Sequence, residues 1–394
     1  MEILRKVVTD QSAKMPPFFS IIIPVYNRPE ELAELLESLK TDLEYAAESH
    51  SGNQKTSKAK LKQDSSKNAG TQVDIFDKNN SSNTHSEKPD LSLQTEIIVV
   101  DDGSEEHSKA VCRKYEHSLN IRYIYQENTG PGKARNTGAG TANGEWLIFF
   151  DSDCVIPKGY INAVKQGTAD RNIDIFGGPD RASSDFSATQ KAIDYAMTSF
   201  FTTGGIRGGK KQLDRYYPRS FNMGIRKTAF QHVDGFSALR FGEDLDLSMR
   251  LIAAGYRPAL LDKAWVYHKR RTDLKKFFKQ VYNSGMARVV LQQRHPGTMK
   301  AIHLMPSFFV LYILAAFISI PFLSGWLWIP VVLFVILLFL DGWRLTKQTK
   351  AALLIPPAAF SQLLGYGSGL IHALFHIRVF GKKEAQAFTR NFYR

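Results

Sequence analysis

The sequence predicts an α/β domain with a mostly parallel central sheet, followed by a C-terminal helical membrane region. Three observations carry this prediction. Short apolar runs alternate with helical patterns over residues 18–268, acids directly follow two of these runs, and long apolar stretches dominate the chain after residue 295. The carboxyl ends of parallel strands share one edge of a sheet, which is where such sheets bind ligands. We therefore expect the acids to form a site there.

Composition narrows the class of protein. The chain has 394 residues, a formal net charge of +13 and two cysteines. Cys112 and Cys154 are too few for a disulfide scaffold and lack zinc-ligand spacing, which favours a reducing compartment. The basic residues gather near the apolar tail without a recognisable DNA- or RNA-binding module, so anionic lipid and a polyphosphate ligand explain the charge better than nucleic acid. The first ten residues, MEILRKVVTD, lack a continuous apolar core, so we expect no signal peptide and a cytoplasmic globular part.

The first strand and helix are predicted from residues 18–39. FFSIIIPV reads as a buried strand that Pro24 ends, and Pro29 suits the first turn of the helix that follows. Leucines then recur at helical spacing at positions 32, 35, 36 and 39. Over about residues 49–90 the sequence is rich in Ser, Asn, Lys, Asp and Gln and poor in aromatics. Such a segment cannot bury enough apolar area to offset its ordering entropy, so we expect a mobile polar insertion.

Acids follow the second and fourth predicted strands. Residues 96–100 (EIIVV) end in Asp101 and Asp102, and residues 146–150 (WLIFF) end in Asp151, Ser152 and Asp153, with a short strand at 121–125 between them. The two carboxylates of the Asp-Ser-Asp step can splay toward one divalent cation, or divide between a cation and a ribose hydroxyl. A solvated turn is the alternative interpretation of this short pattern.

A glycine-rich segment at residues 127–138 carries basic side chains. It is not a Walker A loop, because Ala134 follows Lys133 and Glu127 stands where that motif has glycine. The following Gly138-Ala139-Gly140 is not a dinucleotide fingerprint either, because the third glycine falls one residue late, at Gly144, and the segment closes a helix instead of opening one after a strand. What remains is a loop and a helix start on which Lys133 and Arg135 can face an anionic nucleotide. A solvated basic face is the alternative.

Further strands are predicted at residues 173–176 and 265–268, with the segment RSFNMGIR at 219–226 between them. Glu243 and Asp244 stand at a predicted helix start, where the helix dipole favours negative charge and where acids are often only caps. His268 comes at the end of the last strand. Taken alone, it reads as a structural histidine.

Taken together, the ordered motifs resemble those of family 2 inverting nucleotide-sugar glycosyltransferases, which have the GT-A fold. The motifs are IIIPVYNR, IIVVDDGS, GPGKARNTG, FFDSDC, NMGIR and GEDLDLSMRL, and the resemblance covers about residues 18–268. It implies that the nucleotide-sugar is bound by Pro24, Tyr26, Asp102, Lys133, Arg135, Asp151 and Ser152. It also implies Asp244 as catalytic base, a meeting point of acceptor and donor sugar at Asn222, Met223 and Glu243, and a metal site at Asp153 and His268. The insertion at 49–90 departs from the family pattern and leaves acceptor docking open.

The resemblance implies a metal-dependent single displacement. Mg²⁺ or Mn²⁺ would neutralise the leaving diphosphate, and a carboxylate would remove the acceptor hydroxyl's proton as the oxygen attacks the anomeric carbon. The expected donor is a UDP-sugar, and the expected acceptor is a lipid-linked or cell-surface glycan. No second nucleophilic carboxylate is needed, unlike in a retaining glycosidase.

After a globular domain over residues 1–270, the sequence of residues 271–394 predicts three membrane-associated parts. An apolar stripe beside lysines in residues 271–300 predicts an amphipathic helix at the membrane surface, with a domain-packing helix as the alternative. Within residues 301–394, stretches 304–323 and 326–340 are long enough for two spans. A third stretch, 351–375, contains Pro356, Pro357 and several glycines. Basic clusters flank all three stretches, which predicts a cytoplasmic carboxyl terminus and a third stretch that re-enters or lies in the interface; a third span is the alternative.

Two functional classes compete. The first is a membrane-anchored transferase at the cytoplasmic face of the inner membrane, acting in cell-envelope glycan synthesis. The second is a processive synthase that extrudes its polymer. No QxxRW sequence follows Asp244, and two or three spans make a poor channel, which favours the first. A catalytically inactive binding protein is disfavoured by the intact set of acids.

Overall fold

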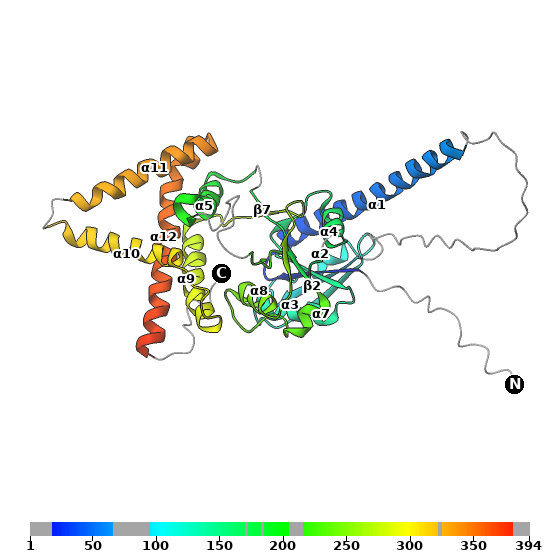
Figure 1. Ribbon diagram of the computed structural model, residues 1–394, viewed down its shortest axis with the longest axis horizontal. Coiled ribbons are helices and arrows are strands. Elements are labelled where there is room, and N and C mark those ends of the chain that lie inside the picture. The colour runs from blue at the N-terminus through cyan, green and yellow to red at the C-terminus, as the bar shows by residue number, and fades with distance from the viewer. Residues whose placement is uncertain are drawn as a thin grey trace, which may run out of the picture.

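A computed structural model describes residues 18–65, 95–169, 172–182, 185–204, 216–321 and 325–380. These residues form an α/β domain and a helical region that lies at one end of the molecule (Figure 1). The seven-stranded sheet has the order β3-β2-β1-β4-β8-β6-β9. Its strands are β1 (Phe19–Val25), β2 (Thr95–Asp102), β3 (Ile121–Gln126), β4 (Trp146–Phe150), β6 (Ile175–Gly177), β8 (Asn222–Arg226) and β9 (Pro258–Leu260). Neighbouring strands from β3 to β4 are parallel, which confirms the predicted fold class.

Helices cover both faces of the sheet, and the alternation of side chains along β1 shows why. Ile21 and Ile23 pack toward α1 (Pro29–Ser65), α2 (Lys109–Arg113) and α4 (Tyr160–Ala169), whereas Ile22 packs toward α3 (Pro131–Thr141), α7 (Lys227–His232) and α8 (Glu243–Ala253). Both faces are buried, so the interior positions of β1, β2 and β4 are almost all apolar; the exceptions Ser20 and Glu96 are hydrogen-bonded to each other at 2.6 Å.

The direction of β8 decides what lies beside the acids. It runs antiparallel to β4, and Asn222 at its start pairs with Phe150 at the end of β4. The loop that precedes β8 therefore reaches the same sheet edge as Asp151. A second sheet of β5 (Cys154–Val155), β7 (Asp180–Arg181) and β10 (Val266–His268) pairs His268 with Cys154. This pairing brings His268 to the segment that follows β4.

The helix α1 is longer than the sequence pattern predicts. It continues to Ser65, so the first part of the predicted insertion at 49–90 prolongs a helix, and the rest of the insertion lies outside the described residues. From residue 44 to residue 65 the chain contains no proline and a single glycine, Gly52, among many Lys, Ala, Gln and Glu residues. These residues favour helix, so polarity alone does not end α1.

The helical region is joined to the α/β domain through α9 (Leu274–Arg294), α5 (Ala188–Thr198), α6 (Phe200–Thr203) and α12 (Thr349–Phe380). Phe277 and Val281, from the stripe predicted to face the membrane, are buried against Ile193 of α5 and Ile355 of α12. Small residues on α5 and α12 leave room for these side chains. The domain-packing alternative therefore describes this part of α9.

The glycines of the third apolar stretch serve helix packing. The stretch forms one continuous helix, α12, in spite of Pro356 and Pro357, so the expected re-entrant break is absent from it. A Cβ on Gly369 would collide with the carbonyl oxygen of Tyr282 on α9, and a Cβ on Gly285 of α9 would collide with that of Tyr366 on α12. Glycine thus lets the two helix backbones approach each other.

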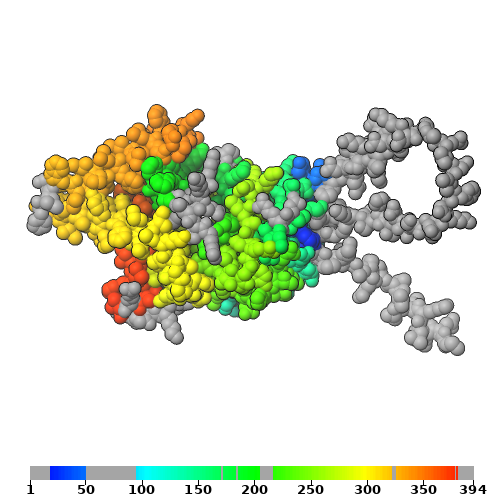
Figure 2. All heavy atoms as spheres, viewed as in Figure 1, coloured from blue at the N-terminus to red at the C-terminus, as the bar shows by residue number. Residues whose placement is uncertain are grey.

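Within the described residues, two helices are long and apolar enough to cross a membrane: α10 (Ala301–Ser319), and α11 (Ile329–Thr346) together with the short 3₁₀ turn η1 (Trp326–Trp328) that precedes it. They correspond to the two predicted spans at 304–323 and 326–340. Their side chains are largely uncovered, with Met305 63% exposed and Ile318 70% exposed. In Figure 2 these yellow and orange helices project from one end of the molecule. Such a contiguous apolar surface is unusual for a protein in water.

Candidate active site

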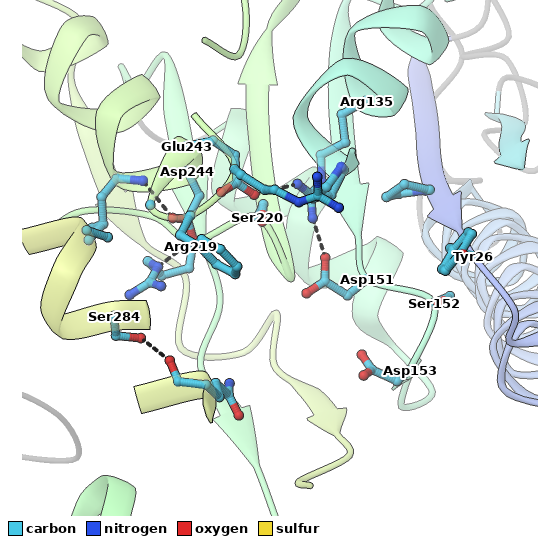
Figure 3. Close-up of a pocket in the computed structure, with 18 of the residues that line it drawn as sticks. Tyr26, Arg135, Asp151, Ser152, Asp153, Arg219, Ser220, Glu243, Asp244 and Ser284 are labelled. Atoms are coloured by element: carbon cyan, nitrogen blue, oxygen red, sulfur yellow. Dashed lines mark hydrogen bonds and ion pairs between the residues drawn. The ribbon is translucent and has the colours of Figure 1, made fainter. Parts of the chain in front are cut away.

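A pocket of about 300 Å³ lies at the carboxyl edge of the parallel strands, between the α/β domain and the helical region (Figure 3). Its lining includes most of the site residues that the sequence predicts, namely Pro24, Tyr26, Asp102, Arg135, Asp151, Ser152, Asp153, Glu243 and Asp244. In Figure 3, Asp151, Ser152 and Asp153 lie on one side, and Asp244, Arg219 and Ser284 lie on the other. The structure thus brings the strand-end acids and the α8 acids to one cavity.

Arg135 links the two acidic groups. Its Nη2 lies 2.6 Å from Oδ1 of Asp151, and its Nη1 lies 3.1 Å from Oε1 of Glu243. The side chain of Arg135 is only 4% exposed. Burial disfavours the charged guanidinium, but Asp151 and Glu243 outweigh that cost and raise the pKa of Arg135. Arg135 is therefore a permanently charged and firmly held cation in the wall of the pocket.

Glu243 is the most easily protonated acid of the pocket for which a shift is resolved. Burial and the neighbouring Asp244 raise the pKa of Glu243 to about 7, against the opposing effect of Arg135. A carboxyl group in this range can exist in either protonation state near neutral pH. Its role as a sugar contact at the meeting point of the substrates stays a prediction, and its position in the pocket is consistent with it.

Asp153 is held by two cationic partners. Arg28, directly after β1, forms an ion pair with Oδ2, and Nε2 of His268 lies 3.1 Å from Oδ1. Burial alone would raise the pKa of Asp153, but His268 and Arg28 hold it well below its usual range. Asp153 is therefore ionised and ready to bind a cation. Arg28 belongs to the motif IIIPVYNR, but no pattern in the sequence predicts its ion pair with Asp153, which is distant in the chain.

The donor atoms around Asp153 suit a hard divalent cation in part. Ligand atoms of Asp153, Cys154 and His268 lie within 4.8 Å of one another. Nδ1 of His268 is buried without a hydrogen-bond partner among the described residues, and Oδ1 of Asp153 has Nε2 of His268 beside it at 3.1 Å. Burial raises the pKa of the Cys154 thiol well above its ordinary value, so this sulfur stays protonated and is a poor ligand for Mg²⁺ or Mn²⁺. The fitting ligands are Asp153 and His268.

Asp102 has a structural task at the same edge. Its carboxylate accepts hydrogen bonds from the backbone N–H of Thr129 at 2.9 Å and of Gly130 at 2.8 Å, and from the side chain of Gln126 at 2.7 Å. These bonds fix the loop that leads into α3. Asp102 thereby positions Arg135, one turn into that helix, and also lines the pocket itself.

Asp244 stands at the start of α8 and is strongly paired. Its Oδ2 lies 2.6 Å from Nε of Arg219, its Oδ1 accepts the N–H of Leu245 at 2.8 Å, and its side chain is 10% exposed. Burial would raise the pKa of Asp244, but Arg219 outweighs burial and lowers it. The neighbouring Asp246 does not line the pocket and pairs with Arg250 at 2.9 Å. Of the three acids at the start of α8, Glu243 and Asp244 therefore line the pocket, whereas Asp246 has a structural role.

The lining excludes four of the predicted site residues. Asn222 is buried in β8, where its side chain accepts from Tyr160 at 2.7 Å and donates to the carbonyl of Ala264 at 2.8 Å. Met223 is fully buried in the core beneath the sheet. Their register with Phe150 and Phe149 makes them interior strand positions, so in this structure neither contacts the pocket.

Lys133 and His268 are excluded from the lining for different reasons. Lys133 is exposed on α3, because a helix turns by about 200° over two residues and Arg135 is the one that faces inward. His268 lies behind Asp153, so it reaches the pocket only through that carboxylate. The strand register that pairs His268 with Cys154 produces this indirect position.

The helical region supplies a wall that sequence reasoning missed. Gln280, Ser284 and Arg288 of α9, with Tyr366 of α12, line the pocket opposite the strand ends. Arg219, Arg240 and Arg271 also line it. The only sequence signal was the concentration of basic residues before the apolar tail, which reads equally well as a membrane-facing cluster.

Comparison with known proteins agrees with this geometry. Residues 87–234 match the family described as "Glycosyl transferase family 2". The glycosyltransferase GlyG of Streptococcus pneumoniae is 34% identical over 185 residues, which are 44% of this chain and 61% of that protein. The minor teichoic acid biosynthesis protein GgaB of Bacillus subtilis is 25% identical over 182 residues, which are 45% of this chain and 20% of that protein. The matches thus span only part of each relative.

The fold similarity reaches further along the chain. The structure of a mannosyltransferase from Pyrobaculum calidifontis, in complex with GDP-Man and Mn²⁺, aligns over 89% of this chain and 88% of that one, with a TM-score of 0.54 and 15% identity. At this identity the likeness speaks for the fold alone. The family match therefore shows a family 2 glycosyltransferase domain over residues 87–234, and the structural likeness agrees with a GT-A fold.

Proposed function

We propose that the enzyme transfers a sugar from a nucleotide diphosphate-sugar to a hydroxyl group of a lipid-linked or cell-surface glycan. One observation carries this proposal: the acids at the end of β4 and Asp244 at the start of α8 face a single pocket from opposite sides. A donor held at the strand ends would then present its anomeric carbon toward Asp244. The name of the teichoic acid relative and the nucleotide-sugar in the mannosyltransferase structure support the same substrate classes.

The donor side of the pocket carries the binding chemistry. Pro24 and Tyr26 at the end of β1 provide a surface for the base, while Asp102, Asp151 and Ser152 lie where ribose hydroxyls can reach them. Asp153 and His268 would hold Mg²⁺ or Mn²⁺, which when bound offsets the negative charge of the leaving diphosphate. Arg28 neutralises Asp153 in this structure, so its guanidinium must turn away when a cation binds and can then pair with a phosphate oxygen.

Asp244 is the proposed general base. Its carboxylate takes the proton of the acceptor hydroxyl while the oxygen attacks the anomeric carbon from the side opposite the diphosphate, which inverts that centre. Arg219 keeps the carboxylate ionised but also makes it a weaker base. We therefore propose that Arg219 loosens its contact when the acceptor binds. Glu243, through its ion pair with Arg135, holds the two sides of the pocket together.

The enzyme's proposed location is the cytoplasmic face of the inner membrane. The helices α10 and α11 have the length and exposed apolar surface of a membrane hairpin, and basic residues stand before the first and after the second. Tight packing of α12 on α9 and α5 keeps this third helix with the catalytic domain. A reporter fused after Arg394 should read as cytoplasmic; an extracytoplasmic reading would favour a third span.

A processive synthase is less well supported. Such an enzyme passes its polymer through a channel of its own spanning helices, and within the described residues only α10 and α11 qualify as spans. Product length distinguishes the two functions. A transferase adds one sugar per acceptor, whereas a synthase yields long polymer at low conversion.

The test is turnover by the purified full chain with a panel of nucleotide-sugars and Mn²⁺, in the presence of bacterial lipid extract and isolated cell-wall polymer. Release of nucleotide diphosphate from one donor, abolished by EDTA and by Asp244→Asn, is the expected result. An exposed acid outside the pocket gives the matched control, Asp262→Asn, which should retain wild-type turnover. Turnover that persists in EDTA would contradict the proposed metal dependence. Failure to release nucleotide diphosphate from any donor would contradict the proposed glycosyl transfer.

A further inference from the structure

Two arginines of the pocket differ from the others in their pairing. Arg28, Arg135 and Arg219 each form an ion pair with an acid of the pocket. Arg240, in the loop before α8, and Arg288, on α9, line the same pocket, and neither has an ion-pair partner among the residues that the structure describes. The pocket therefore offers positive charge that its own acids do not neutralise.

The pair is suited to an anion with several oxygens. A guanidinium group presents a rigid fork of N–H donors that matches phosphate or carboxylate geometry, and it remains charged at any physiological pH. Arg288 is half-buried and Arg240 is exposed, so one arginine can hold an anion within the pocket while the other closes over it from the rim. On the same helix, Gln280 adds an amide group to this wall, while the hydroxyl of Ser284 donates to the carbonyl of Gln280 at 3.0 Å.

Position separates these arginines from the donor site. The donor acids follow β4, and the cationic partner of Asp153 follows β1, both on the strand side of the pocket. Arg240 lies in the loop that leads into α8, the helix that carries Asp244, and Arg288 comes from the helical region. An anion bound by them lies on the side from which the acceptor must approach Asp244.

We propose that Arg240 and Arg288 bind a phosphate group of the acceptor, which is thus a phosphate ester or diester with a free hydroxyl near Asp244. This inference rests on the proposed function and names the class of its acceptor. Two sources share this chemistry: a glycerophospholipid headgroup and a water-soluble polyol phosphate. The pocket wall is continuous with the apolar helices, because Tyr366 lines the pocket and the adjacent Gly367 packs on Pro306 of α10. A lipid headgroup can therefore reach the arginines from the membrane side.

The test measures phosphate binding directly and does not depend on turnover. The full chain in detergent is titrated with sn-glycerol 1-phosphate, and separately with nanodiscs of phosphatidylglycerol or of phosphatidylcholine, each with and without UDP and Mn²⁺. The double variant Arg240→Gln/Arg288→Gln is compared with wild type. The control is Arg113→Gln, an exposed arginine on α2 that does not line the pocket.

We expect the double variant to bind the phosphate probe at least about tenfold more weakly, with UDP affinity unchanged and with wild-type affinities in the control. Binding of glycerol phosphate as well as phosphatidylglycerol indicates that the phosphate alone suffices, and binding of phosphatidylglycerol nanodiscs alone indicates a lipid acceptor. Equal probe binding by wild type and double variant overturns the inference. So does displacement of the probe by UDP, because the arginines would then belong to the donor site. Neither overturning result affects the donor-turnover test of the proposed function.

Discussion

The strand side and the helical side of the pocket handle charge in opposite ways. On the strand side, Asp151 and Asp153 are each matched by a buried or half-buried cation, Arg135 or Arg28, supplied by the same domain. On the opposite side, called the helical side here because α9 and α12 form most of it, Arg288 of α9 and Arg240 of the loop before α8 meet no acid among the described residues. The strand side is thus nearly neutral before a substrate arrives, and the helical side is positive.

This difference suggests a division of tasks. Ion pairs on the strand side keep the acids ionised and oriented. When a cation or a diphosphate binds, the acids and arginines replace each other with the ligand as their charged partner, so little additional desolvation is needed. The helical side has no such internal partner, so its charge is satisfied by solvent or by a ligand. Asp244 stands between the two, and Arg219, with which it forms an ion pair, comes from the loop before β8. The following changes break or sharpen that contrast, from the largest expected effect to the smallest.

Replacing Asp244 by Asn should lower the transfer rate at least about a hundredfold, because general-base catalysis contributes on that scale. Donor affinity should change little, since the strand side is untouched. Initial rates beside calorimetry of donor binding decide the outcome. Retained transfer would show that another group takes the proton, and lost donor binding would move Asp244 to the donor site.

Replacing Asp153 by Ala should weaken Mn²⁺ binding at least about tenfold, because even residues that only support a metal ligand cost about 10–100-fold when removed. The loss should exceed that of Asp151→Ala, since Asp151 is engaged with Arg135. Manganese titration followed by electron paramagnetic resonance measures this without turnover. Equal metal affinity in Asp153→Ala and wild type would contradict the metal assignment.

Replacing Arg219 by Gln should move the acid limb of the pH profile of kcat/KM to higher pH. Arg219 outweighs burial and lowers the pKa of Asp244, so its loss lets that pKa rise and protonates the base at a less acidic pH. Arg219→Lys retains the charge and should shift the limb less. An unchanged limb in Arg219→Gln would mean that Asp244 does not set it.

Replacing Glu243 by Gln tests the raised pKa through stability. The folded state binds the Glu243 proton more tightly than the unfolded state, so wild type loses stability as pH rises from about 4.5 to about 7. The Tm of Glu243→Gln minus that of wild type should therefore increase across this window and level off above it. Glu127→Gln, an exposed acid outside the pocket, should show no such trend. A flat difference for Glu243→Gln would exclude the raised pKa.

Shortening residues 49–90 to a brief polar linker should have the smallest effect. No residue of this range that the structure describes lines the pocket, and the buried leucines of α1 lie before it. We expect turnover within about twofold of wild type and a Tm lower only by the loss of the distal turns of α1. Loss of expression would instead give the insertion a structural task.

The strand side could be predicted from sequence because its signals are local. An apolar run covered on both faces, followed at once by acids, identifies a parallel strand and its functional end in a few residues, as at Trp146 to Asp153. The fold class and the positions of Asp102 and Asp151 at the pocket follow from such runs, whereas Asp244 was assigned from a helix start and the family resemblance. Asn222 and Met223 were assigned from the family pattern, and the antiparallel register of β8 instead places them within the sheet.

The helical side could not be predicted because its contacts depend on packing between distant segments. The apolar stripe of α9 has the same pattern whether it faces lipid or protein, and only α5 and α12 decide which. The glycines of α12 look like helix breaks in sequence, yet they are needed for contact with α9. Likewise, Arg28 and Arg219 acquire their acids only when strands far apart in the chain come together.

The backbone contact between α9 and α12 limits how the enzyme can change its acceptor. Where Gly285 and Gly369 meet the opposite helix, no side chain fills the interface, so no rotamer change can widen it. Tyr366 on one helix and Ser284 on the other stand beside this contact and face the pocket. The width of the proposed acceptor entrance therefore depends on the relative position of the helices α9 and α12, which can change only by movement of one whole helix along the other. Under the proposed function, selection for a bulkier acceptor would act on α10 and α11, which pack against α12, at sites remote from the chemistry.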